Sequence, residues 1–470
     1  MEFFLAFVGF VSLLLIIFLL LKDMTTPAVA FIIVSGSVGI LFVLLDTYAN
    51  LGIARLLKED FDIKYFSDLS DPVFDFNALE YFIKQGISNV ASTAVLFIFS
   101  ILFFGILNEA GVFNKIINVL LKYSKSNIYS ICIFTVIIAA VVHLDGSGAA
   151  SFLIVLPAML PVCERLGMRK TTLMTIVAAS LGIMNVLPWG GPTLRAATII
   201  GAEANDVWIR LIPIQITGLV CALFIATILA HLEIRRGAGK MMVGKAGEMI
   251  EDQITHKIES NEHHRDSKFA INILLVICVI ATLIIDILPG YFPFMLGFCV
   301  ALFINYPELT IANKLIDKYS KSAMMMATTL FGAGILIGVF DVSGIMKVMA
   351  SAILHIFPEW AIMLVPLMVG ITAVPMALIF CTDSYFFGVM PIVVGITNAL
   401  GIDPFSIAII MIVARNCATF ISPVVPATLL GCGLSGVSIK EHITSSFLWV
   451  WGFSIVCLAV GNVLGIIHFF

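Results

Sequence analysis

The stretch Asn185-Val-Leu-Pro-Trp-Gly-Gly-Pro-Thr193 decides the fold of this chain, because it interrupts a long apolar region with residues that cannot continue a helix. Prolines and adjacent glycines break the pattern of helical hydrogen bonds. Backbone groups freed at membrane depth persist only where protein buries them or where they line a watery cavity. The stretch therefore predicts a broken helix that forms part of a binding site near the middle of a bilayer.

Composition places the rest of the chain in a membrane as well. Of the 470 residues, 60% are apolar and only 12% are charged. Several segments reach the roughly 20 apolar residues that cross a bilayer. The positive charge beside the first apolar run, 3–21, follows it at Lys22 instead of preceding it, so this run is predicted to be a transmembrane helix and not a signal peptide. The nine cysteines show no Cys-x-x-Cys spacing, and no basic patch indicates a nucleic-acid partner.

Hydropathy predicts spans at 3–21, 27–45, 90–108, 171–204 (broken), 207–232, 269–287, 291–305, 323–342, 404–432 (broken) and 444–468. Two further apolar regions, 128–160 and 360–398, are interrupted by polar residues near their middle. Each interruption leaves arms of about 15 residues, which are too short to span a bilayer, so both regions are predicted to be re-entrant hairpins. The acid-rich loop 46–88 is predicted to be partly irregular.

An internal repeat relates the two halves. An offset of 234 residues places Pro157 on Pro391, Leu166-Gly167 on Leu400-Gly401, and Pro192 on Pro426. Each half then holds five spans, one of them broken, and one hairpin. Because five is odd, the halves must lie in opposite orientations. The predicted fold is an all-α polytopic membrane protein whose inverted repeats, 1–233 and 269–470, are joined by a cytoplasmic connector, 234–268.

The distribution of charge predicts the orientation. With the N-terminus outside the cell, 18 of the 26 Lys and Arg residues lie on the cytoplasmic side and 6 lie outside, which satisfies the positive-inside rule. The remaining two, Arg195 and Arg415, fall within membrane segments. We therefore predict a multi-pass protein of the cell membrane with both termini outside.

The first half offers polar residues at two points. Asp145, Gly146, Ser147 and Gly148 at the tip of the first hairpin suit either a ligand-binding turn or an ordinary helix N-cap. His143 either carries a coupling proton or forms a hydrogen bond at this tip. The broken helix offers a half-helix N-terminus suited to a carboxylate, and its candidate residues are Asn185, Pro188, Gly190, Gly191 and Thr193. Arg195 either clamps an anion or pairs with Glu203 or a neighbouring acid.

The second half supplies partners at equivalent points. These are Thr382, Asp383 and Ser384 at the second hairpin tip, and Arg415, Asn416, Ser422 and Pro423 in the second broken helix. An arginine at membrane depth indicates an anion contact, with an ion pair to Asp383 as the structural alternative. Asp145 and Asp383 are further candidates for proton coupling, and either can approach a divalent cation that travels with the substrate.

Motifs for other chemistry are missing from the sequence. It contains no His-Glu-x-x-His, no Gly-x-Ser-x-Gly and no Gly-x-x-x-x-Gly-Lys-Ser/Thr, which argues against a hydrolase or an ATP-driven pump. We therefore predict no enzyme activity and a carboxylate transporter that an ion gradient drives. The alternatives are a Na+/H+ or other ion antiporter and a gluconate or dicarboxylate transporter.

Five motifs resemble the citrate-metal:proton symporter family (CitMHS) of the ion transporter superfamily. They are Leu144-Asp-Gly-Ser-Gly148, Leu166-Gly-Met-Arg169, Leu187-Pro-Trp-Gly-Gly-Pro-Thr-x-Arg-Ala-Ala197, Thr382-Asp-Ser-Tyr-Phe-Phe-Gly-Val-Met-Pro391 and Ser422-Pro-Val-Val-Pro-Ala427. The resemblance implies a homodimer that imports citrate with Mg2+ or Ca2+ and protons, by an elevator motion of a transport part against a scaffold. It implies no cofactor bound to the protein itself. The chain departs from the family pattern at Arg415-Asn416, where a small residue followed by Gln or another polar residue is expected.

Overall fold

The computed structural model describes residues 1–22, 24–123, 127–239, 265–285, 287–356 and 358–469. These residues fold into helices, and no strand occurs among them. Nine of the described helical segments are long and apolar enough to cross a membrane. The prediction of an all-helical polytopic membrane protein is therefore confirmed. Most of the predicted connector, residues 240–264, lies outside the described residues.

The first half contains long helices, a short amphipathic helix, a helix pair and a broken helix. In chain order they are α1 (Glu2–Leu21), α2 (Pro27–Ala49), α5 (Phe76–Glu109), α6 (Val112–Tyr123), α7 (Ile128–Val142) paired with α8 (Gly148–Arg165), α9 (Lys170–Met184) broken from α10 (Gly191–Ile199), and α11 (Ala204–Arg235). The short helices α3 (Ile53–Glu59) and α4 (Lys64–Ser67) lie between α2 and α5.

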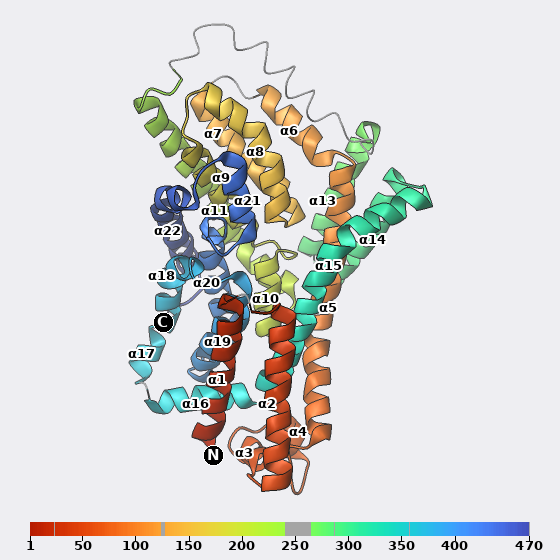
Figure 1. The fold of residues 1–470 in the computed structure, drawn as a ribbon, viewed down its shortest axis with the longest axis vertical. Coiled ribbons are helices and arrows are strands. Elements are labelled where there is room, and N and C mark those ends of the chain that lie inside the picture. Colours follow the sequence, from red (N-terminus) through yellow and green to blue (C-terminus); the bar gives the residue numbers. More distant parts are fainter. Residues whose placement is uncertain (23, 124–126, 240–264, 286, 357, 470) are drawn as a thin grey trace.

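The second half repeats this order of elements. It contains α13 (Phe269–Ile285), α14 (Tyr291–Asn305), α15 (Leu309–Ile337), α16 (Ile345–Ile356), α17 (Glu359–Met363), α18 (Val365–Ala377) paired with α19 (Met390–Ala399), α20 (Pro404–Cys417) broken from α21 (Pro426–Ser435), and α22 (Ile439–Val463). Single turns are η1 (His143–Asp145), η2 (Asp266–Lys268), η3 (Gly338–Val342), η4 (Ser384–Val389) and η5 (Thr419–Ile421). The equivalent short helices α6 and α16 lie near opposite ends of the molecule, as inverted repeats require (Figure 1).

The loop predicted at 46–88 is shorter than expected. Helix α5 begins at Phe76, where the Asp75 carboxylate accepts the backbone N–H of Ala78 at 2.8 Å and caps the helix. Hydropathy missed this start because the first turns of α5 carry polar residues. The irregular part is closed by the buried Asp46 carboxylate, which accepts three backbone N–H groups, those of Ile53, Ala54 and Phe74.

Helices α5 and α15 cross through glycines, and both are longer than the predicted spans 90–108 and 323–342. A Cβ added to Gly86 of α5 would lie 2.0 Å from the carbonyl oxygen of Gly334 and 2.8 Å from the Cα of Gly338. Only glycine permits such a close approach of two backbones. Helices α2 and α14 also pack on these two, and together the four form one group of helices (Figure 1).

The two broken helices form the centre of a second group. Helix α9 packs against α7, α11, α20 and α22. Residues 172–184 of α9 and 406–417 of α20 are all buried. Where the two helices approach their breaks, a Cβ on Gly182 would lie 2.7 Å from the carbonyl oxygen of Asn416. The fold therefore brings the polar interruptions of both halves together inside the protein.

Candidate functional site

Hydrogen bonds within the first break satisfy part of its own backbone. The Thr193 hydroxyl donates to the carbonyl oxygen of Val186 at 2.9 Å, and the Gly190 N–H donates to the Leu187 carbonyl at 2.8 Å. Pro188 is buried in the same turn, and a side chain on Gly190 would meet the Asn185 carbonyl oxygen at 2.4 Å. Thr193, Pro188 and Gly190 thus shape the break.

The second break is built in a similar way. The Thr428 hydroxyl donates to the Thr419 carbonyl at 3.3 Å, as Thr193 does in the first break. The Ser422 hydroxyl donates to the carbonyl oxygen of Ala377 at 2.5 Å, which ties this break to the second hairpin. Pro423 is half-buried in the turn. Ser422 is therefore occupied by protein contacts in this structure.

The tip between α7 and α8 is held by both breaks. Gly146 adopts a left-handed conformation with φ of +70°, and the Asp145 carboxylate accepts the Ser147 N–H at 2.8 Å. The Ser147 hydroxyl caps α8 at the N–H of Ala150. Two contacts fasten the tip to the breaks: the Trp189 indole N–H donates to the Leu144 carbonyl at 2.8 Å, and Gly148 packs against the ring of Phe420.

His143 lies fully buried behind this tip. The Ser151 hydroxyl donates to the Ser147 carbonyl at 2.7 Å, so it accepts from His143 Nδ1 at 2.8 Å. The hydrogen is therefore on Nδ1, and the lone pair is on Nε2. The Nε2 atom is buried and meets no hydrogen-bond donor at bonding geometry among the described residues, and the side chain of Asn185 lies near the ring. The imidazole therefore lies beside the first break.

Asn185 and Asn416 meet where the broken helices cross. The Asn185 amide nitrogen lies 3.5 Å from Asn416 Oδ1, and both side chains are buried. Among the described residues, the amide nitrogen of Asn416 has no hydrogen-bond partner. An unsatisfied buried donor is uncommon in proteins and requires an explanation, such as a water molecule or a ligand that is bound in another state.

The second hairpin tip is joined to the first broken helix by an ion pair. Arg195 Nε lies 2.7 Å from Asp383 Oδ1, with side-chain exposures of 8% and 20%. Gly191 makes room for the arginine, because a side chain there would meet Arg195 Nη1 at 2.5 Å. Of the alternatives predicted for Arg195, the structure shows pairing with an acid, Asp383. Ser384 is buried beside Cys381, with 3.1 Å between the two side-chain heteroatoms.

Arg415 is fully buried and has only neutral partners. Its Nη1 donates to the Thr419 hydroxyl at 3.0 Å, and its Nη2 lies 3.3 Å from the Phe380 carbonyl and 3.5 Å from the Thr382 hydroxyl. Its Nε has no partner among the described residues, and no ion pair to Arg415 occurs among them. The ion pair between Arg415 and Asp383, the structural alternative in the prediction, is therefore wrong, because Arg195 takes that carboxylate.

Comparison with known proteins identifies the family of this chain. The model of the family described as "CitMHS: Citrate transporter" matches residues 7–414. The chain belongs to the CitMHS citrate transporter family. The resemblance predicted from the motifs is therefore confirmed.

Two relatives of this family come from Bacillus subtilis (strain 168). A "Citrate transporter" is 29% identical over 465 residues, which cover 99% of this chain and 100% of the relative. A "Mg(2+)/citrate complex secondary transporter" is 31% identical over 394 residues, 84% of this chain and 90% of the relative. The solved structure of the Alcanivorax borkumensis YdaH transporter shares the fold, with a TM-score of 0.62, 14% identity, and coverage of 94% and 99%.

His442 of this CitMHS protein is a site residue that the sequence analysis missed. Its Nε2 donates to the carbonyl oxygen of Phe420 at 2.9 Å, and its Nδ1 lies 3.2 Å from the Ser446 hydroxyl. It therefore holds the backbone of the second break. The available signal was an ionisable residue near the start of an otherwise apolar span. Hydropathy placed that span at 444–468 and so excluded the histidine.

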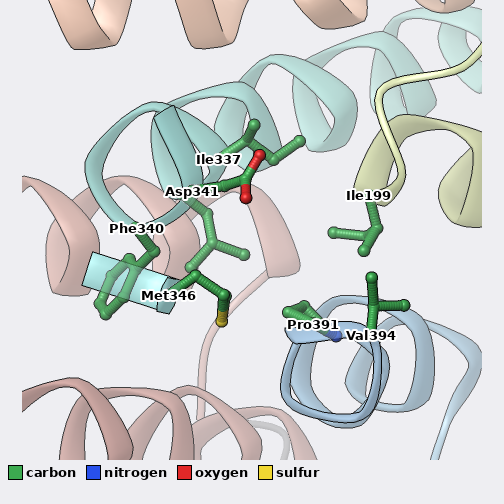
Figure 2. Close-up of a pocket in the computed structure, with 8 residues that line it drawn as sticks. Ile199, Ile337, Phe340, Asp341, Met346, Pro391 and Val394 are labelled. Atoms are coloured by element: carbon green, nitrogen blue, oxygen red, sulfur yellow. The ribbon is translucent and has the colours of Figure 1, made fainter. Parts of the chain in front are cut away.

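Two spaces beside the site of this CitMHS protein are small. The space beside Arg195, lined in part by Gly191 and Met326, has no room for a water-sized group. A crevice of about 30 Å³ separates Asp341 and Met346 from Ile199 on the other side (Figure 2). Ligand pockets usually measure hundreds of Å³. Neither of these two spaces reaches that size.

Proposed function

We propose that this protein imports citrate or a related carboxylate, as a complex with Mg2+ or Ca2+, in symport with protons. The observation that carries the proposal is Arg415, a guanidinium that is fully buried and has no carboxylate partner among the described residues. Removing an unpaired charge from water costs several kcal/mol. A bound carboxylate would compensate this charge, and the unsatisfied Asn416 amide beside it can donate a second hydrogen bond.

The metal is proposed as part of the substrate. Asp145 and Asp383 supply carboxylates at the two tips, where they can approach the cation. The name of one B. subtilis relative, "Mg(2+)/citrate complex secondary transporter", supports the same form of substrate. Asp383 is the better placed of the two, because its ion pair with Arg195 lies at the same tip as Thr382, which contacts Arg415.

Uptake by purified protein in liposomes tests this proposal. Labelled citrate should enter faster with saturating Mg2+ or Ca2+ than with a chelator, and an inward proton gradient should accelerate it. Unlabelled dicarboxylates and gluconate test the width of the specificity. Pure proton flux driven by Na+, without any carboxylate dependence, would contradict the proposal and indicate an antiporter.

His143 is the proposed carrier of the coupling proton. Its Nε2 lone pair meets no donor at bonding geometry among the described residues. By contrast, Asp145 already accepts a hydrogen bond and Asp383 already forms an ion pair. His143→Gln should lower the ratio of uptake with a proton gradient to uptake without one to near one, because the amide does not titrate. Citrate exchange without a gradient should persist. His355→Gln is the control, since that histidine of α16 is exposed and lies outside the breaks and the tips. Full gradient stimulation in His143→Gln would place the proton elsewhere.

Transport is proposed to proceed by an elevator motion. The repeats 1–233 and 269–470 would each contribute a hairpin and a broken helix to the moving part, and α2, α5, α14 and α15 would form the scaffold. The crevice between α15–α16 and α10–α19 has largely apolar walls, which favours sliding along it. Cysteine pairs across this crevice should cross-link in a substrate-dependent way. Cross-linking that leaves transport intact would argue against the motion.

The proposed assembly is a homodimer with both chain termini outside the cell. The family resemblance supports the dimer, and the positive-inside rule supports the orientation. The mass of the purified protein in detergent should equal two chains, and tags at both ends should react with impermeant reagents on intact cells. The mass of a single chain would contradict the dimer, and inaccessible tags would contradict the orientation.

A further inference from the structure

Three charged side chains from three elements meet at the second hairpin tip. Arg195 of α10 pairs with Asp383 of the tip at 2.7 Å, and Arg415 of α20 reaches the neighbouring Thr382 at 3.5 Å. We refer to Arg195, Asp383 and Arg415 as the charge triad.

The charge triad has one net positive charge. One guanidinium is neutralised by the Asp383 carboxylate, and the other has no acidic partner in the described chain. In a buried site this balance matters, because charges there are poorly screened and each unpaired charge is costly. The ligand that fits the triad without leaving a surplus has one net negative charge.

A free tricarboxylate does not meet this condition. Its carboxylates would compete with Asp383 for Arg195, and Asp383 would then face an anion of the same sign. A complex with one divalent cation has three carboxylates and two positive charges, so one negative charge remains. It also presents a cation to Asp383 while its carboxylates approach Arg195 and Arg415, so that every member of the triad keeps an opposite charge.

We propose that Arg195, Asp383 and Arg415 select the substrate by its net charge, favouring the monoanionic complex of a tricarboxylate with one divalent cation over the free trianion. This inference rests on the proposed function and assigns its choice of substrate to specific residues. The quantity that measures it is the ratio of citrate uptake with saturating Mg2+ to uptake with a chelator.

Two single substitutions should move this ratio in opposite directions. Asp383→Asn leaves the triad with two positive charges, so it should lower the ratio by about tenfold or more. Arg195→Gln leaves it with none, so it should raise the ratio by a similar factor. The double variant Arg195→Gln/Asp383→Asn restores one positive charge and should return the ratio close to that of the wild type.

The controls separate charge selection from general damage. Asp403 also lies near an arginine, 3.8 Å from Arg210, but this pair is half-exposed, so Asp403→Asn should leave the ratio unchanged. Because the ratio is taken within each variant, differences in the amount of active protein cancel. If one single variant does not fold, the other and the double variant still give a result.

The outcomes distinguish this inference from the proposed function. Wild-type protein that transports no carboxylate in either form contradicts both. Wild-type protein that transports citrate, combined with an unchanged ratio in either folded single variant, overturns the charge triad alone. A double variant that keeps the ratio of Asp383→Asn also overturns it, since net charge would then not be the determinant.

Discussion

Arg415→Gln is expected to lower the apparent affinity for citrate on the order of a hundredfold to a thousandfold, because the substrate loses its buried cationic partner. Folding should not suffer. The wild-type guanidinium is buried without a carboxylate among the described residues, so removing its charge should leave the melting temperature in detergent unchanged or higher. Affinity is measured by concentration-dependent uptake and by ligand-induced thermal stabilisation.

The control for this variant is Arg55→Gln. Arg55 has a 63% exposed side chain, 3.5 Å from Asp71, and such a surface pair contributes little to stability. Uptake should stay as in the wild type. If Arg415→Gln retained its affinity for citrate, the anion site would have to lie elsewhere. If it instead unfolded the protein, Arg415 would have a structural role.

Gly182→Ala is expected to destabilise the protein by roughly 1–3 kcal/mol, because the added methyl group overpacks the crossing of the two broken helices. Its Cβ would lie 2.7 Å from the Asn416 carbonyl oxygen and 3.1 Å from that of Cys417. Both contacts are backbone atoms, which cannot rotate away. The displaced backbone carries Asn416 and Arg415, so substrate affinity should fall together with the melting temperature.

Gly36→Ala makes the same substitution in the middle of another helix, α2. Among the described residues, no atom beyond the adjoining backbone of α2 lies within 4 Å of its added Cβ. Alanine favours helix over glycine by up to about 1 kcal/mol, so this variant should be neutral or slightly more stable. Equal melting temperatures for Gly182→Ala and Gly36→Ala would show that the helices can separate at Gly182 without penalty.

The sequence alone predicted the long apolar helices and where they break, but not the short helices α3, α4, α6 and α16. The apolar periodicity and the residues of Pro188-Trp-Gly-Gly-Pro192 are local signals. The repeat offset of 234 residues then predicted an equivalent break in the second half. Hydropathy failed where helices continue through polar residues. It placed the start of α5 near 90 instead of Phe76 and missed His442 at the start of α22.

The pairing of charges could not be predicted in the same way. The sequence placed Arg195, Asp383 and Arg415 at membrane depth, where each required a partner, but two arginines and one acid allow more than one pairing. Arg195 and Asp383 are separated by 188 residues, and they meet because α10 packs against η4, which follows the second tip. Helix breaks and family motifs depend on residues that are neighbours in the chain, so the sequence by itself determined the broken helices and the family. Only the packing of the two halves decided that Asp383 pairs with Arg195, and that Arg415 is left without a carboxylate partner among the described residues.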